Sequence, residues 1–324
     1  MKHKNFLIRF LTAIIILSII FLFPGAPGRA EAAGKKSVIV SFYPLFIHAV
    51  NVAGDKMNMD ILLPPGVGVH DFNCKPSDIK KIAAADLLIV NGAGLDNFAL
   101  KIAENYRQSG LKTADASYGV ELISAAGGEI CAGHDHAGHA HEGNAALIDP
   151  HTWLSPKNAV IQVNNIAAAL SGIDPENASY YRTNADTYIK MLEEIDKTAV
   201  RKLSPFKGLK FIVFHGSFAY FARDYGLVQD SIADAFGNAP KPSKIKEIYD
   251  IIKKENIKFL VTEPGFRNKE ITALREQYAL ETIELDPMGM YAPAKSADFY
   301  YIEIMKSNID KLAAAFEKAG TVKK

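Results

Sequence analysis

Three histidines and one aspartate stand at positions where side chains of their type can bind a metal ion. His70, His151 and His215 each lie where an apolar run gives way to a loop, and Asp286 follows the apolar run at residues 282–285. In open α/β sheets, ligands bind where loops converge at the carboxyl ends of the strands. Three imidazoles and one carboxylate suit a borderline-soft divalent cation. A single histidine at such a position is more often structural, so the inference depends on the whole set.

The elements that must position these residues follow one pattern in both halves of the chain. Apolar runs of strand length alternate with helical patterns, and a strand that is apolar throughout is typical of a parallel βα unit. The sequence therefore predicts an α/β fold of two lobes, each with a mostly parallel sheet flanked by helices. The apolar runs are residues 37–40, 59–63, 86–90, 209–214, 259–262 and 282–285, and the helical patterns are residues 46–52, 77–85, 218–225 and 244–255.

One long helix is predicted between the two lobes. Asp174 is a helix N-cap residue, and Pro175 suits the first helical position after it. Residues 176–203 contain neither glycine nor proline, which predicts one rigid helix of about 28 residues, or about 42 Å. Two shorter helices with an unmarked break are the alternative. The predicted domains are an N-terminal lobe at 37–173, a linking helix at 174–203 and a C-terminal lobe at 204–324.

The N-terminus is typical of a secretory signal peptide. Three basic residues precede an apolar run at residues 10–23, and small residues follow it as far as Ala32. We therefore expect residues 1–32 to be cleaved and the mature protein to be periplasmic or otherwise exported. The run is short for a membrane span of about 20 residues, and an uncleaved membrane anchor is the alternative. No cysteine lies in or directly after the run, so we expect no lipid anchor.

The charge balance argues against a nucleic-acid partner. The chain has 37 lysines and arginines and 36 aspartates and glutamates, which gives a formal charge of +1. Removal of residues 1–32 takes away four basic groups and one acidic group and leaves a formal charge of −2. A mature protein of this charge lacks the strongly basic balance that marks nucleic-acid binding.

Export makes the two cysteines candidates for a disulfide, because an oxidising compartment preserves such bonds. They are Cys74 and Cys131. Two free thiols are the alternative. Neither cysteine belongs to a CxxC pair of the kind that marks a thiol redox enzyme or a thiolate zinc site.

Segments in both halves of the chain carry a resemblance to a known family. They resemble the metal-specific solute-binding proteins of bacterial ABC importers, the zinc, manganese and iron group. The resemblance runs from about residue 37 to the C-terminus. Its motifs are VSFYPL (40–45), LPPG (63–66) with HDF (70–72) and PSD (76–78), ADLLIVNGAGL (85–95), DPHTWLSP (149–156) and HGSFAYF (215–221).

The resemblance implies a fold and a ligand set that agree with the reading of the residues. In the family, one long helix joins two α/β lobes, and one residue from each of four loops holds the ion. By position these are His70 and His151 from the first lobe, and His215 and Asp286 from the second. Zinc binders resemble one another in placing histidine at the third position, where manganese binders place a carboxylate. His215 therefore predicts zinc, because imidazole suits zinc and an oxygen-rich shell suits manganese.

The implied function is high-affinity binding of Zn²⁺ outside the cytoplasm and its delivery to the transmembrane permease of an ABC importer. Manganese or iron(II) binding in the same importer class is the runner-up. We expect a monomer whose partners are the zinc ion and the permease. Two residues depart from the family pattern, Asp96 by being shorter than the usual acidic residue and Cys74 by its type; neither is a proposed ligand.

A low-complexity segment at residues 127–144 is predicted to be a mobile surface loop. Zinc-binding members of the family resemble this chain in carrying a histidine- and acid-rich insertion here. Exposed imidazoles at spacings of two and three residues can chelate zinc weakly without a preformed cage. We therefore expect an auxiliary low-affinity metal site, and a solvated linker is the alternative. The four histidines of this segment are His134, His136, His139 and His141.

Other classes of function have less support in the sequence. A zinc hydrolase keeps a coordination position open for water and has a carboxylate base within reach, whereas three histidines with Asp286 close a tetrahedron. The chain has no HExxH, GxSxG or GxxxxGK[ST] motif, and we expect no enzyme. An adhesin is a third class that the sequence leaves open. We expect Glu263 to orient a ligand imidazole, Trp153 to pack beside the site, and His48 to be a structural or surface residue.

Overall fold

The computed structural model describes residues 34–64, 66–125, 130–131, 148–289 and 297–320. Lys36–Lys324 form one compact unit, and the account below concerns that unit. The predicted signal segment, residues 1–32, lies outside the described residues, as does all of the histidine-rich segment except residues 130–131. Within the described ranges, no helix combines the length and the apolar character needed to cross a membrane.

The N-terminal lobe contains a four-stranded sheet in the order β2-β1-β3-β4, in which every pair is parallel. Its strands are β1 (Ser37–Val40), β2 (Asn58–Ile61), β3 (Leu87–Val90) and β4 (Lys112–Asp115), and its flanking helices are α2 (Tyr43–Ala53), α3 (Pro76–Ala84) and α4 (Asn97–Glu104). The bounds of β1, β2, β3, α2 and α3 agree with the predicted ones to within three residues, whereas β4 and α4 were not predicted.

The C-terminal lobe repeats this plan with a parallel sheet in the order β10-β9-β7-β8. Its strands are β7 (Lys210–His215), β8 (Val228–Ala233), β9 (Phe259–Thr262) and β10 (Glu281–Glu284), and its helices are α7 (Ala219–Tyr225), α8 (Pro242–Lys254) and α9 (Lys269–Tyr278). The prediction of two α/β lobes with parallel sheets is therefore confirmed.

Burial on both faces explains why the central strands are apolar throughout. Successive side chains of a strand point to opposite faces of the sheet. In β3, Leu87 and Ile89 belong to the central core of the protein, whereas Leu88 and Val90 belong to the core beneath α3 and α4. β7 behaves in the same way, with Ile212 in the core beneath α8 and α9.

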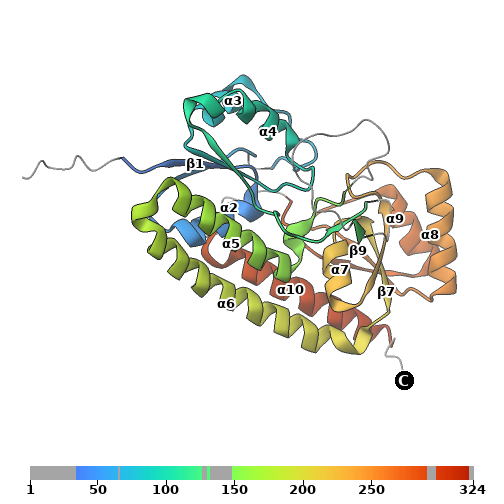
Figure 1. Ribbon diagram of the computed structural model, residues 1–324. Coiled ribbons are helices and arrows are strands. Elements are labelled where there is room, and N and C mark those ends of the chain that lie inside the picture. Colours follow the sequence, from blue (N-terminus) through green and yellow to red (C-terminus); the bar gives the residue numbers. More distant parts are fainter. Residues whose placement is uncertain (1–33, 65, 126–129, 132–147, 290–296, 321–324) are drawn as a thin grey trace, which may run out of the picture. The chain divides into compact units, whose positions relative to one another are not determined.

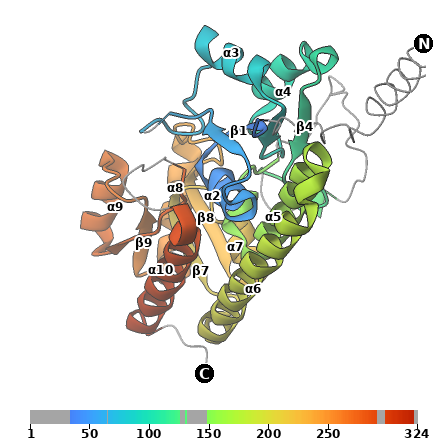
Figure 2. The same cartoon turned by 90° about the vertical axis from the view of Figure 1, so that its left-hand side faces the viewer.

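The three long helices are α5 (Pro156–Ile173), α6 (Ala178–Leu203) and α10 (Ala297–Lys318), and α6 packs against each of the other two (Figures 1 and 2). α6 is the predicted long helix, but it begins two residues later than predicted, because Pro175–Asn177 form a 3-10 turn, as is frequent at helix N-termini. α10 packs against both α6 and α2, so the lobes are also connected by helix packing. The domain boundaries at residues 173 and 203 stay a prediction.

A short antiparallel hairpin flanks the segment that is not described. Its strands, β5 (Leu122–Ile123) and β6 (Ile130–Cys131), pair Leu122 with Cys131 and Ile123 with Ile130. Cys74 is a free thiol, so for this residue the structure agrees with the alternative of unpaired cysteines.

Candidate metal centre

Three of the four predicted ligands converge at one point. The rings of His70, His151 and His215 have their centroids 4.8–5.3 Å apart in pairs. One ligand atom of each lies within 4.8 Å of the others. Three separate segments supply them, which are the loop after β2, the residue before the 3-10 turn η2 (Thr152–Leu154), and the end of β7. Residues 81 and 64 positions apart in sequence therefore meet in one cluster.

The spacing of two imidazole nitrogens fits a shared tetrahedral zinc ion. Nε2 of His70 lies 3.3 Å from Nε2 of His151. Zinc binds imidazole nitrogen at 2.0–2.1 Å, so two nitrogens on one tetrahedral ion lie about 3.3 Å apart. These two nitrogens can therefore bind one ion with little movement.

His151 is buried and its orientation is fixed by Asp149. Nδ1 of His151 donates to Oδ1 of Asp149 at 2.8 Å, and the backbone N–H of His151 donates to the same oxygen at 2.9 Å. This contact leaves Nε2 without a proton and directed at the metal position. Burial lowers the pKa of His151, and Asp149 opposes that effect only in part. The imidazole is therefore neutral and ready to bind a cation.

A buried polar network holds the segment that carries His151. Nδ2 of Asn91 donates to the carbonyl of Pro150 at 2.9 Å, and the Thr152 hydroxyl donates to Oδ1 of Asn91 at 3.1 Å. Nε2 of Gln162, on α5, reaches Asn91, Thr152 and the hydroxyl of Ser117 at 3.1–3.3 Å. Buried polar groups that are hydrogen-bonded in this way specify one conformation.

The sequence motif around Asn91 explains how this network is placed. Gly92 follows β3 with φ +76°, and a Cβ there would lie 2.1 Å from Oδ1 of Asp115, so only glycine fits. The buried Asp96 accepts the backbone N–H groups of Asn91 and Gly92 at 2.6 and 3.1 Å. Asp96 therefore fixes the turn that presents Asn91, even though it is shorter than the acidic residue usual in the family.

His215 ends β7 and is hydrogen-bonded at both ring nitrogens. Nδ1 donates to Oε1 of Glu263 at 2.9 Å, and Nε2 donates to the carbonyl of Ala235 at 3.1 Å. Burial lowers the pKa of His215, but the hydrogen bond and charge of Glu263 outweigh it, and the net shift is upward. Metal binding through Nε2 must replace the contact with Ala235, while Glu263 keeps the ring oriented, as expected from the sequence.

His70 has a looser setting than the other two histidines. Its loop is closed by turn hydrogen bonds from Val67 to Pro64 at 3.4 Å and from Asp71 to Gly68 at 3.0 Å. Burial and the neighbouring imidazoles of His151 and His215 lower the pKa of His70 to about 3. The ring is therefore neutral at physiological pH, and it contacts the rings of His151, His215 and Phe236.

Asp286 does not belong to the cluster. In the described part of the chain, only the three histidines form a group of three or more potential metal-binding side chains. Oδ1 of Asp286 accepts the backbone N–H of Met288 at 2.7 Å, and Oδ2 accepts the Tyr300 hydroxyl at 3.3 Å. Asp286 still follows β10, and His215 ends β7, so both residues lie at the carboxyl end of the same parallel sheet. The prediction that it ligates the ion needs a change in this loop.

Several interactions join the His151 segment to the C-terminal lobe. The Tyr220 hydroxyl on α7 donates to the carbonyl of Asp149 at 2.7 Å, and the Tyr301 hydroxyl on α10 donates to that of Trp153 at 2.7 Å. Ser155, the N-cap residue of α5, donates to Asp224 on α7. Trp153 is fully buried beside His151, as expected.

The remaining candidate histidines play no part in the described cluster. His48 is buried in α2 with Nδ1 3.2 Å from the Tyr188 hydroxyl, and burial lowers its pKa to about 3. It is a structural residue, as predicted. The four histidines of the predicted auxiliary site lie outside the described residues: His134, His136, His139 and His141.

The sequence revealed the three histidine ligands, but it did not reveal all of the groups that hydrogen-bond to them. Asp149 was missed, although a carboxylate two residues before a histidine with proline between them is a usable signal. The carbonyl of Ala235 could not have been found, because a backbone acceptor leaves no mark on residue type.

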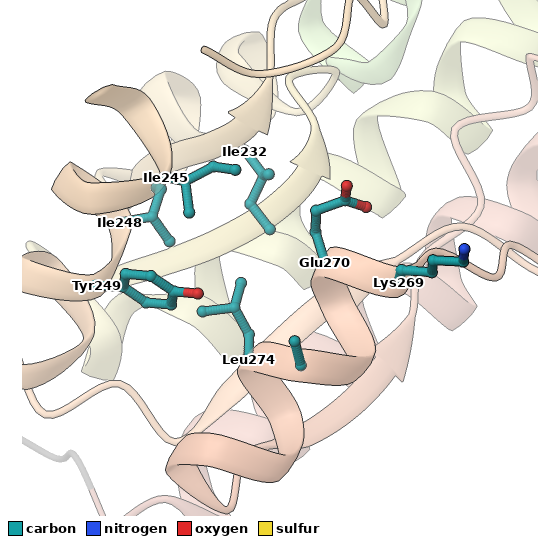
Figure 3. Close-up of a pocket in the computed structure, with 8 residues that line it drawn as sticks. Ile232, Ile245, Ile248, Tyr249, Lys269, Glu270 and Leu274 are labelled. Carbon is teal, nitrogen blue, oxygen red and sulfur yellow. The ribbon is translucent and has the colours of Figure 1, made fainter. Parts of the chain in front are cut away.

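Two cavities have different relations to the cluster. A cavity of about 730 Å³ adjoins it and is lined by Asp149, Gly216, Asp234 and Ala235 among others. A pocket of about 220 Å³ between α8 and α9 is apolar apart from its rim of Lys269, Glu270 and the Tyr249 hydroxyl, and no histidine of the cluster lines it (Figure 3).

Comparison with known proteins finds relatives that are named for zinc binding and zinc uptake. The zinc-binding protein AdcA of Streptococcus pyogenes serotype M6 is 29% identical over 296 residues, which cover 89% of this chain and 58% of AdcA. The high-affinity zinc uptake system protein ZnuA of Bacillus subtilis is 29% identical over 310 residues, which cover 93% of this chain and 96% of that protein. This chain thus spans about three fifths of the length of AdcA.

A solved structure with the same fold is that of the SBP FpvC from Pseudomonas aeruginosa in complex with Mn²⁺. It has a TM-score of 0.74 and 26% sequence identity, and the match covers 88% of this chain and 100% of that chain. The family model described as "ZnuA: Zinc-uptake complex component A periplasmic" matches residues 38–315. The chain therefore belongs to this family, the periplasmic component A of zinc-uptake complexes.

Proposed function

We propose that this protein binds zinc ions outside the cytoplasm and delivers them to the permease of an ABC importer. The observation that carries the proposal is the cluster of three imidazoles, two of whose nitrogens lie 3.3 Å apart. That separation fits two ligands of one tetrahedral zinc ion. The names of the relatives AdcA and ZnuA support the same ion.

The donor set favours zinc over manganese. Three nitrogen donors suit zinc, whereas manganese sites are usually richer in oxygen. The match to a structure that holds Mn²⁺ makes manganese the second candidate. Metal content therefore decides between them.

Asp286 is the fourth ligand in this proposal. Asp286 follows β10, and His215 ends β7 in the same parallel sheet. Both residues therefore lie at the carboxyl end of this sheet, which supports the assignment. The Asp286 carboxylate must leave the N–H of Met288 and the hydroxyl of Tyr300 to reach the ion. The site then has four protein ligands, and a closed tetrahedron is typical of storage or structural zinc rather than of catalysis.

We infer further that the protein does no chemistry on other molecules. A zinc hydrolase needs a carboxylate base free to act on the bound water. Asp149 and Glu263 are the carboxylates hydrogen-bonded to ligand imidazoles, and each orients the ring that it contacts. Export through a signal peptide, a monomeric state, and an auxiliary role for the histidine-rich segment belong to the same proposal.

The test is metal analysis and zinc titration of the purified protein beside His215→Ala. We expect one tight zinc site in the parent and a loss of affinity of at least about 100-fold in the variant, more than the loss of a residue that only orients a ligand. His141→Ala is the matched control and should keep the tight site. A parent that prefers manganese, or a variant that binds zinc as tightly as the parent, contradicts the proposal.

A further inference from the structure

One buried tryptophan, Trp153, contacts a predicted ligand, His151, and also Tyr301 and Pro287. Trp153 is the single tryptophan of the chain and has no exposed surface. Its ring centroid lies 5.0 Å from that of His151, and its backbone carbonyl accepts the Tyr301 hydroxyl on α10. Its indole Nε1 donates to the carbonyl of Pro287 at 2.8 Å. Pro287 is the residue directly after Asp286.

That carbonyl and the group that holds Asp286 belong to one peptide unit. The carbonyl of Pro287 accepts from Trp153, and the N–H of Met288 donates to Oδ1 of Asp286 at 2.7 Å. A trans peptide is planar, with its carbonyl and N–H pointing in opposite directions. The indole hydrogen bond therefore fixes the orientation in which the Met288 N–H reaches the Asp286 carboxylate.

The backbone at Met288 shows that this orientation is not intrinsically preferred. Met288 has φ +56°, in the left-handed region that a residue with a long side chain rarely adopts. Such conformations persist where surrounding contacts impose them, and they are frequent at switch segments and ligand-binding sites. The hydrogen bonds at the Pro287–Met288 peptide are contacts of that kind.

We propose that Trp153 is a positioning residue that latches Asp286 away from the three histidines. While the indole holds the Pro287 carbonyl, the Met288 N–H holds the Asp286 carboxylate, and the Tyr300 hydroxyl contributes a second hydrogen bond at 3.3 Å. Release of the Pro287 carbonyl lets this peptide turn, and Asp286 then becomes available as the fourth ligand. Because Trp153 also contacts the His151 ring, metal binding at His151 and release of Asp286 are coupled. The inference rests on the proposed zinc function.

The test compares Trp153→Phe in the parent chain and in a chain that carries Asp286→Asn. Phenylalanine keeps an aromatic ring and removes the N–H donor. Release of one hydrogen bond that favours the latched form should tighten zinc binding by about three- to tenfold in the parent. In the Asp286→Asn chain the same change should alter zinc affinity by less than about twofold, because no carboxylate is left to release.

Tyr300→Phe is a second variant that keeps the tryptophan. It should also tighten zinc binding, and only where Asp286 is present. Since Trp153 is the single tryptophan, its emission reports on the indole. We expect the change in emission on zinc addition to be smaller in Asp286→Asn than in the parent. Tyr188→Phe, which removes a buried hydroxyl in contact with His48, is the matched control and should change neither readout.

Two results overturn the inference while leaving the proposed function intact. One is that Trp153→Phe and Tyr300→Phe weaken zinc binding, or leave it unchanged, equally in both backgrounds, as a merely structural role would. The other is that Asp286→Asn binds zinc as tightly as the parent, which would also remove Asp286 from the proposed ligand set but leave zinc binding and delivery as the proposed function. A parent chain without tight zinc binding would instead refute the proposed function.

Discussion

The segments that carry His151 and His70 contribute to one metal site but are held in very different ways. The His151 segment is buried and is hydrogen-bonded to Asn91 of its own lobe and to Tyr220 and Tyr301 of the other lobe. The His70 segment is half-buried, is closed by turn hydrogen bonds of its own, and packs Val67 and Val69 against the core. One ligand is thus fixed by a hydrogen-bond network before the ion arrives, whereas the other lies in a loop that no such network ties to the rest of the protein.

The His151 side of the site is therefore the preformed part. A buried network with several hydrogen bonds holds one conformation, whereas a half-buried loop closed by its own turns opens at a lower cost in free energy. Ion exchange with solvent should therefore involve the His70 side more than the His151 side.

Removal of each histidine gives the largest expected effect. His151→Ala should lower zinc affinity by more than about 100-fold, and His70→Ala by about 10- to 100-fold. The reason is that water can take the place of the half-exposed His70, whereas loss of the buried His151 also leaves Asp149 without its partner. Competition titration against a chelator of known affinity measures both. Equal losses in the two variants would contradict the idea that His151 is the fixed ligand.

Removal of the Asn91 side-chain amide should have a smaller effect on zinc affinity, and it should affect only the segment that carries His151. Asn91→Ala removes the buried amide that donates to the Pro150 carbonyl, which then keeps only the Thr152 N–H at 2.8 Å, and it should lower the free energy of unfolding by about 1–3 kcal/mol. Zinc affinity should fall by about tenfold. Asn73→Ala, which removes an exposed amide bonded to the Asp71 carbonyl at 3.3 Å, is the matched control.

For Asn73→Ala we expect a change in unfolding free energy below about 0.5 kcal/mol. Denaturant unfolding of the metal-free proteins measures both values. If the Asn73 variant were as destabilised as the Asn91 variant, the two segments would be equally constrained.

The pH dependence of zinc binding should come mainly from His215. Zinc needs neutral imidazoles, and the pKa values of His70 and His151 are already lowered, so these rings carry no proton that must leave at neutral pH. The pKa of His215 is raised by Glu263, so this ring becomes protonated first as the pH falls. Affinity should then fall by about tenfold for each pH unit below the His215 pKa, which corresponds to one proton.

Glu263→Gln separates this source of pH dependence from the others. It keeps an oxygen acceptor for Nδ1 of His215 but removes the charge, so the pKa of His215 should fall and the loss of zinc affinity should begin at lower pH. Calorimetry in buffers of different ionisation enthalpy counts the protons released. A count of three near pH 6 would show that all the histidines titrate like free imidazole.

The smallest effect is expected at Cys74, which lies in the segment after His70. Its thiol is free in the structure, so Cys74→Ser should change the unfolding free energy by less than about 0.5 kcal/mol. Zinc affinity should change by less than about twofold. Thermal unfolding with and without a reductant provides the measurement. A large loss of stability on reduction of the parent would mean that a disulfide with Cys131 anchors this segment, and the contrast with His151 would weaken.

The sequence predicted the central strands well because they are buried on both faces. Runs such as residues 87–90 and 259–262 have no polar positions that face solvent, and their bounds in the structure match the apolar pattern closely. The long helices were harder. α5 and α10 went unpredicted, and α10 lies partly against α2 of the other lobe, a long-range contact that no local pattern records.

The site was predictable as far as residue types go. His70, His151 and His215 were all predicted where apolar runs give way to loops, and the structure brings them together, although of the three only His215 ends a strand. The state of Asp286 was not predictable, because it depends on the Met288 N–H and the Tyr300 hydroxyl, which its own segment and α10 place beside it. The cause lies in tertiary contacts, whereas the sequence shows only that a carboxylate follows a strand.

The contacts of α7 with the His151 segment also affect when, during folding, the protein becomes able to bind zinc. Tyr220 secures the Asp149 carbonyl, and its hydroxyl also accepts the backbone N–H of Ile123. Asp149 and Ile123 lie 71 and 97 residues from Tyr220 in sequence. Contacts of such long range form late in folding. Tight zinc capture should therefore mark the completion of folding. A chain that stops before residue 219 should reach its compartment with part of the N-terminal sheet formed and still retain no ion.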